Sequence, residues 1–95
     1  MTEIAWSEWL DYNLEQISKI PEEGGVYMMH AAMKILYIGN TANLRQSISE
    51  SLNNSCIKEA KRFKYSIASN HEQIGSQLLK EYQEKHDGKL PKCME

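Results

Sequence analysis

Apolar residues recur at helical spacing near the start of the chain. Leu10, Leu14 and Ile17 are separated by four and three residues, the spacing of one stripe along an α-helix. Ser7 is a favourable capping residue for the start of such a helix. The residue before a proline avoids the α region, so the helix should end before Pro21. We therefore predict an N-terminal helix within residues 1–20.

The spacing changes to that of β-strands after the turn at 22–25. Residues 26–30 and 35–38 form two short apolar runs, and two strands this close in sequence most simply pair antiparallel. Residues 35–38 are almost all apolar, which predicts a central, buried strand. Residues 63–67 alternate between apolar and polar side chains, which predicts a third, half-buried strand.

Helical spacing returns in two later segments. Leu44, Ile48 and Leu52 form one stripe, which begins after Thr41 or Asn43. A last helix begins at Ser69 or Asn70 and ends at Gly88, and its stripe consists of Ile74, Leu78 and Tyr82. Residues 56–61 predict a helical turn, and residues 89–94 an extended tail. The sequence thus predicts one α+β domain over residues 1–95, with a three-stranded antiparallel sheet flanked by helices.

Composition and charge narrow the function classes. The chain has 95 residues, 41% hydrophobic and 25% charged, which is typical of one globular domain. It lacks an apolar run of membrane-spanning length and a basic leader, so we expect no membrane association and no signal peptide. Residues 1–23 hold six acids and one base, giving −5, whereas residues 24–95 hold seven acids and ten bases, giving +3. This balance argues against strong nonspecific nucleic-acid binding.

Several residues have both a functional and a structural interpretation. Four bases in seven residues could follow a phosphate backbone or form a solvated surface: Lys58, Lys61, Arg62 and Lys64. Trp6 and Trp9 are core residues, or the surface through which the first helix binds a protein partner or a second copy. The histidines show no ligand spacing. Cys56 and Cys93 predict two reduced thiols and a cytoplasmic protein.

Two short motifs carry a family resemblance. Gly25-Val26-Tyr27 precedes Tyr37-Ile38-Gly39 by ten residues, and a helix start containing Asn43-Leu44-Arg45 follows. This arrangement over residues 21–94 resembles the GIY-YIG nuclease superfamily, in which a hairpin with both motifs precedes a helix, a third strand and another helix. The resemblance implies a metal-dependent DNA endonuclease fold, with Tyr27 and Tyr37 at the two motif tyrosines.

The charged residues of that family are not retained at the matching positions. The position that corresponds to its phosphate-stabilising arginine is Ser47, and Arg45 lies two residues earlier, about 200° around the helix. Gly75 stands where the metal-binding glutamate is expected, and Glu72 lies one turn earlier. Met94 replaces an asparagine near the end, and Asn40 replaces the lysine that often follows the second motif.

Three hypotheses follow. The first is a binding module for nucleic acid that has lost nuclease activity and needs no cofactor. The second is an endonuclease with a rearranged site of Tyr27, Arg45 and Glu72 and with Mg²⁺ or Mn²⁺. The third is a protein-interaction domain without a nucleic-acid role. The missing charged groups favour the first, and Tyr27 and Tyr37 could then serve mainly as packing residues of the sheet.

Overall fold

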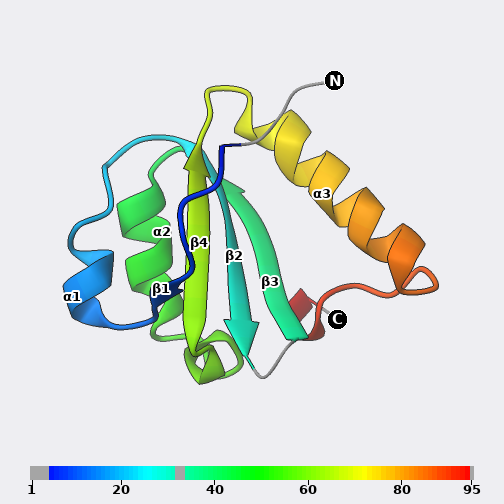
Figure 1. The fold of residues 1–95 in the computed structure, drawn as a ribbon, viewed down its shortest axis with the longest axis horizontal. Helices are drawn as coiled ribbons and strands as arrows, with labels where there is room; N and C mark the ends of the chain where they lie inside the picture. Colours follow the sequence, from blue (N-terminus) through cyan, green and yellow to red (C-terminus); the bar gives the residue numbers. More distant parts are fainter. Residues whose placement is uncertain (1–4, 32–33, 95) are drawn as a thin grey trace.

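The computed structural model describes residues 5–31 and 34–94 and consists of a sheet between two helical layers (Figure 1). The elements, in chain order, are β1 (Leu10–Asp11), α1 (Leu14–Ile17), β2 (Gly25–Ala31), β3 (Lys34–Thr41), α2 (Leu44–Ser51), the 3₁₀ helix η1 (Ile57–Glu59), β4 (Arg62–Ile67), α3 (His71–Lys85) and the 3₁₀ helix η2 (Lys92–Met94). No helix of the described residues has the length and apolar character needed to span a bilayer.

The sheet is antiparallel, and its four strands lie in the order β1-β4-β2-β3. The predicted strands are confirmed, but the three-stranded count is wrong because β1 adds a two-residue edge strand to β4. The predicted central position of residues 35–38 is also wrong, since β3 lies at an edge and β2 is central. The apolar character of β3 reflects contacts with α3 and η2 rather than a second neighbouring strand.

Within residues 5–20 the predicted N-terminal helix is largely absent, because the backbone there pairs with the sheet, and residues 1–4 of the prediction lie outside the described residues. The Ser7 amide donates to the Tyr65 carbonyl at 2.9 Å, and the Tyr65 amide donates to Ser7 Oγ at 3.0 Å. Only Leu14–Ile17 is helical, and its cap is Asn13, whose side chain accepts from the Gln16 amide. Pairing with β4 thus determines the conformation of this segment, although its apolar residues have helical spacing.

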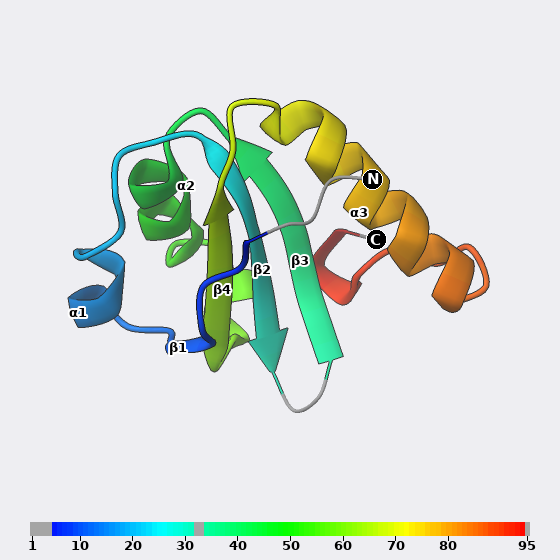
Figure 2. The ribbon, with the colours of Figure 1, turned by 45° about the horizontal axis from the view of Figure 1, so that its top comes forward.

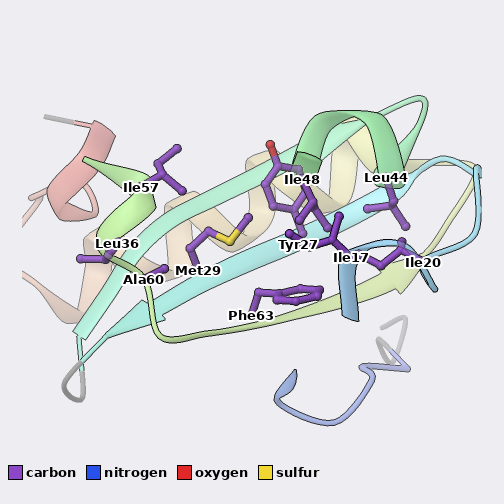
Figure 3. Close-up of a cluster of buried hydrophobic side chains, with 10 residues drawn as sticks. All are labelled: Ile17, Ile20, Tyr27, Met29, Leu36, Leu44, Ile48, Ile57, Ala60 and Phe63. Carbon is purple, nitrogen blue, oxygen red and sulfur yellow. The ribbon is translucent and has the colours of Figure 1, made fainter. Parts of the chain in front are cut away.

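The main core lies on the sheet face that α1, α2 and η1 cover (Figure 3). Asn43 caps α2 by accepting from the Gln46 amide, as one of the two predicted starts requires. The α2 stripe then places Leu44 and Ile48 against the sheet with no exposed surface. Phe63 of β4 and Met29 of β2 are equally buried, so the centre of this face is closed to solvent.

The opposite face, which α3 covers in Figure 2, has a smaller core. Ile74 and Leu78 of α3 contact Val26 and Ile38, which confirms the predicted stripe. Asn70 is the N-cap residue of α3. After α3, positive φ angles at Asp87 and Gly88 turn the chain back toward β3. The tail that follows is not wholly extended, because it forms η2.

The two cysteines are joined by a disulfide, so the prediction of reduced thiols is wrong. Their Cα atoms lie 5.7 Å apart across a sequence separation of 37 residues. Such a distance suits a disulfide. Cys56 immediately precedes η1 and Cys93 lies in η2, so the bond ties the C-terminal segment to the layer beside the main core. The spacing of two cysteines this far apart in sequence does not predict that they are in contact.

Candidate functional site

The two motif tyrosines contact each other on the α2 face of the sheet. Their ring centroids lie 5.8 Å apart with an interplanar angle of 23°. Gly39 pairs with Tyr27 across β2 and β3, and a Cβ at Gly39 would lie only 2.6–2.8 Å from atoms of both rings. The glycine of the second motif is therefore needed so that both rings can lie over β3.

Tyr27 has the surroundings of a core residue. Its side chain is 6% exposed, and Figure 3 shows it among the buried side chains with its hydroxyl beside α2. Burial, and to a smaller extent the adjacent Tyr37, raises the pKa of Tyr27 well above the ordinary tyrosine value. A hydroxyl that resists ionisation is a poor general base at neutral pH. Tyr37 is half-buried and keeps some access to solvent.

Arg45 is committed to contacts away from the tyrosine pair. Its Nε donates to the Ile20 carbonyl at 2.7 Å, and its Nη1 lies 3.8 Å from Glu22 Oε2. The guanidinium thus links α2 to the segment before β2. At the position expected for a catalytic arginine, Ser47 Oγ lies 2.5 Å from Thr41 Oγ1. The structure therefore brings no arginine to the two rings.

Asn40 fills the space in front of Gly75, the position expected for a metal-binding glutamate. A Cβ at Gly75 would lie 2.7 Å from Asn40 Nδ2 and 3.0 Å from Asn40 Cβ. His71 at the start of α3 lies close by, with Nδ1 3.2 Å from Asn40 Oδ1. Asn40 and Gly75 thus replace the lysine and the carboxylate of the family pattern. Sequence comparison identified both replacements but not their contact.

The remaining candidates also fail to form a metal site. Glu72 is exposed in the first turn of α3, which covers the sheet face opposite the tyrosines. Met94 packs against the small core under α3, and a thioether is a poor ligand for hard cations. Within residues 5–31 and 34–94, no three His, Cys, Asp or Glu side chains gather closely enough to hold a metal ion. Among the described residues, the position of the family's metal ligand therefore offers Gly75 and the Asn40 amide and no carboxylate.

The four candidate nucleic-acid-binding bases separate into different surroundings. Lys58 and Lys61 are exposed, and Arg62 Nε lies 3.9 Å from Asp11 Oδ1. Lys64 Nζ lies 4.7 Å from the ring centroids of both Trp6 and Trp9, and the resulting loss of hydration lowers the pKa of Lys64. The hydrophobic spacing did not predict this cluster, because it placed both tryptophans with an N-terminal helix.

A family model and solved structures place this chain among known proteins. The model described as "Domain of unknown function (DUF7508)" matches residues 5–85. The chain belongs to the DUF7508 family. No curated protein sequence matches it.

The DUF7508 chain is similar in structure to the GIY-YIG N-terminal endonuclease domain of UvrC from Thermotoga maritima. A point mutant of that domain with its catalytic divalent cation has a TM-score of 0.66 and 24% identity, covering 83% of this chain and 90% of that one. The magnesium-bound form has a TM-score of 0.65 and 24% identity, covering 83% and 91%. The resemblance predicted from the motifs is therefore confirmed as a GIY-YIG-like fold.

Proposed function

We propose that this DUF7508 domain uses a GIY-YIG-like fold as a binding module and does not cleave phosphodiester bonds. The observation that carries the proposal is the contact of Asn40 with Gly75. Where a metal-binding carboxylate would project, the space holds a neutral amide that also contacts His71. A nuclease of this fold would need a charged group there to stabilise the transition state.

The arginine adds a second, independent reason. Arg45 would have to leave the Ile20 carbonyl and Glu22 before it could approach a phosphate near Tyr37. Removal of a single stabilising group typically lowers an enzymatic rate about 10²–10³-fold. Loss of both the arginine and the carboxylate would leave little cleavage to detect.

A cleavage assay tests the proposal. Purified protein is incubated with supercoiled plasmid and with branched DNA in the presence of Mg²⁺ or Mn²⁺, and both substrates should remain intact. The matched control is Tyr27→Phe, which keeps the ring and removes the hydroxyl. Cleavage by the unmodified protein that disappears in Tyr27→Phe, and also in Glu72→Gln, would establish the rearranged nuclease site instead.

Nucleic acid is the bound partner that we favour, because bases and an accessible indole lie on neighbouring parts of β4 and the N-terminal segment. Trp9 is 38% exposed and its ring lies 4.9 Å from that of His30. Exposed Lys61 immediately precedes β4, and exposed Lys58 lies in η1 three residues earlier. Aromatic stacking together with backbone-tracking bases is the usual design of single-strand binding surfaces.

Tryptophan fluorescence titrations with a short single-stranded oligonucleotide test this choice of partner. Binding should weaken steeply with salt, because bound lysines release counterions from the phosphates. Lys58→Gln/Lys61→Gln should reduce affinity, whereas Lys19→Gln/Lys80→Gln, with the same charge change elsewhere, should not. Salt-independent binding, or none, would favour a protein-interaction domain.

A further inference from the structure

A cleft lies on the α3 face, between the start of β3, the C-terminal half of α3 and the tail. It has a volume of about 430 Å³ and is lined by Lys34, Ile35, Tyr82, His86, Lys89, Leu90 and Lys92. This size falls within the roughly 300–1,000 Å³ of small-molecule sites. Lys34 is six residues before Asn40 along β3, about 20 Å in an extended strand. The cleft is thus separate from the motif end of β3.

The wall formed by the tail is fixed in place on both sides of Lys92. Pro91 is fully buried, and Cys93 is bonded to Cys56. Upstream, the Gly88 amide donates to the Gln83 carbonyl at 2.7 Å and the Lys89 amide to the His86 carbonyl at 3.1 Å. The two tail lysines therefore project from a backbone that is already ordered, which lowers the entropy cost of binding a ligand.

The charge of the cleft is positive. Three of its seven lining residues are lysines, and none of the seven is acidic. Among the described residues, no carboxylate lies within ion-pair distance of these three lysines. A smaller adjoining hollow adds one residue of each sign, Glu81 and Lys85, so the excess of positive charge remains. Three lysines that line one cleft suit a phosphate group.

The rest of the lining is aromatic and apolar. The rings of Tyr82 and His86 stack with centroids 4.0 Å apart and an interplanar angle of 19°. Ile35 and Leu90 are the apolar lining residues, and both are half-buried. Inorganic phosphate alone would leave this surface uncovered, whereas a flat heterocycle could stack on it.

We propose that this cleft binds a nucleoside phosphate, with the phosphate at Lys34, Lys89 and Lys92 and the base against Tyr82 and Ile35. The same chemistry is offered by a free mononucleotide and by the phosphorylated end of a nucleic-acid strand. The site includes neither the tyrosine pair nor the surface near β4 formed by Trp9, Lys58 and Lys61. The proposal for this cleft can therefore be confirmed or refuted independently of the function proposed above.

Backbone amide NMR titrations test the proposal with AMP, adenosine, inorganic phosphate and a short oligonucleotide with or without a 5′-phosphate. AMP should shift the resonances of Ile35, His86 and Leu90, and should bind at least about tenfold more tightly than adenosine or phosphate. Tighter binding of the 5′-phosphorylated oligonucleotide would assign the site to strand ends, and tighter binding of AMP to free nucleotide. Both outcomes support the cleft as a nucleoside phosphate site.

Substitutions separate the two halves of the ligand. Lys89→Gln/Lys92→Gln should weaken AMP about tenfold or more, whereas Lys19→Gln/Lys80→Gln should not. Tyr82→Leu should abolish the preference for AMP over phosphate while phosphate binding persists. Thermal unfolding of each variant verifies its fold. No shifts at millimolar AMP, equal binding of phosphate and AMP, or indifference to the Lys89/Lys92 substitutions would overturn the proposal.

Discussion

The two faces of the sheet differ in how completely helices cover them and bury their side chains. The α2 face buries ten side chains in one cluster, including Tyr27 of the first motif. The α3 face buries four, and its margins hold the Trp6–Lys64–Trp9 cluster and the basic cleft. α3 covers β3 and part of β2 and leaves β4 to the N-terminal segment.

This difference separates the motif from the surfaces suited to binding. The tyrosines that mark a nuclease signature serve the closed face as packing residues, because Gly39 lets their rings lie over β3. The basic cleft and the Trp6–Lys64–Trp9 cluster lie on the face where α3 covers only half of the sheet, whereas Lys58 lies in η1 on the other side. Under the proposed function, the retained motif reflects the fold rather than the reaction, and matched substitutions on the two faces can test that proposal.

The largest effect is expected from the disulfide. It joins Cys93 in η2 to Cys56, the residue before η1. We call the α2 face the closed face and the α3 face the open face. Cys56→Ser/Cys93→Ser should lower the free energy of unfolding by about 4 kcal/mol, because the 37-residue loop is no longer restrained in the unfolded chain. Urea denaturation measures the change. The unmodified protein in dithiothreitol is the control and should match the variant. Equal urea midpoints for its oxidised and reduced forms would contradict the role given to this bond.

A matched pair of leucines compares the two faces directly. Leu44→Ala on the closed face should cost about 3 kcal/mol of unfolding free energy, because Leu44 has no exposed surface. Leu79→Ala on the open face should cost about 1 kcal/mol, since Leu79 is only half-buried. Urea denaturation again provides the measurement. Equal costs would mean that both faces are equally well packed.

Two glycines sharpen the same contrast. Gly39→Ala should cost about 1–3 kcal/mol, because its Cβ would meet the packed rings of Tyr27 and Tyr37. Gly75→Ala should change stability by less than about 0.5 kcal/mol. There the gain in helix propensity offsets the rotation of the exposed Asn40 amide and a small shift away from the Asn40 Cβ, which would lie at 3.0 Å. If Gly75→Ala is the more damaging of the two, the Asn40 contact is more rigid than we infer.

The smallest effect concerns alkaline pH. Because burial raises the pKa of Tyr27, the unfolded chain ionises this tyrosine above pH 10 while the folded protein does not. Stability contributed by the neutral hydroxyl is complete below pH 10 and decreases above it, by about 1 kcal/mol at pH 11. Tyr27→Phe should remove this part of the decrease. Burial also raises the pKa of Tyr12, so Tyr12→Phe should reduce the slope as well. A Tyr27 hydroxyl that titrates near pH 10 in the folded protein would contradict its burial.

Hydrophobic spacing predicted the elements that are continuous in sequence. The stripe of α2, the stripe of α3 and the strands β2 to β4 follow from periodicity alone. The prediction of an N-terminal helix was wrong. Leu10, Leu14 and Ile17 have helical spacing, but Ser7 forms hydrogen bonds with the backbone of Tyr65 instead. The edge position of β3 and the disulfide depend on contacts between distant segments, which local spacing does not encode.

The sequence named the candidate residues of the site, but it did not predict which residues they contact. The sequence alone revealed the two tyrosines and the replacements at positions 47, 75 and 94. It did not reveal that Arg45 binds the Ile20 carbonyl, or that Asn40 fills the space before Gly75. Each of these facts depends on which segments the fold brings together, as does the cleft formed by residues 34–35, 82–86 and 89–92.

The central claim is that the motif end of β3 is not a divalent-metal site, and paramagnetic broadening by Mn²⁺ tests it most directly. Amide spectra are recorded with increasing Mn²⁺, with Ca²⁺ as a diamagnetic control. We expect no selective loss of the resonances of Asn40, Thr41 and residues 71–75. Selective broadening of these resonances that Glu72→Gln abolishes would contradict the claim and restore a metal-dependent nuclease as the best account.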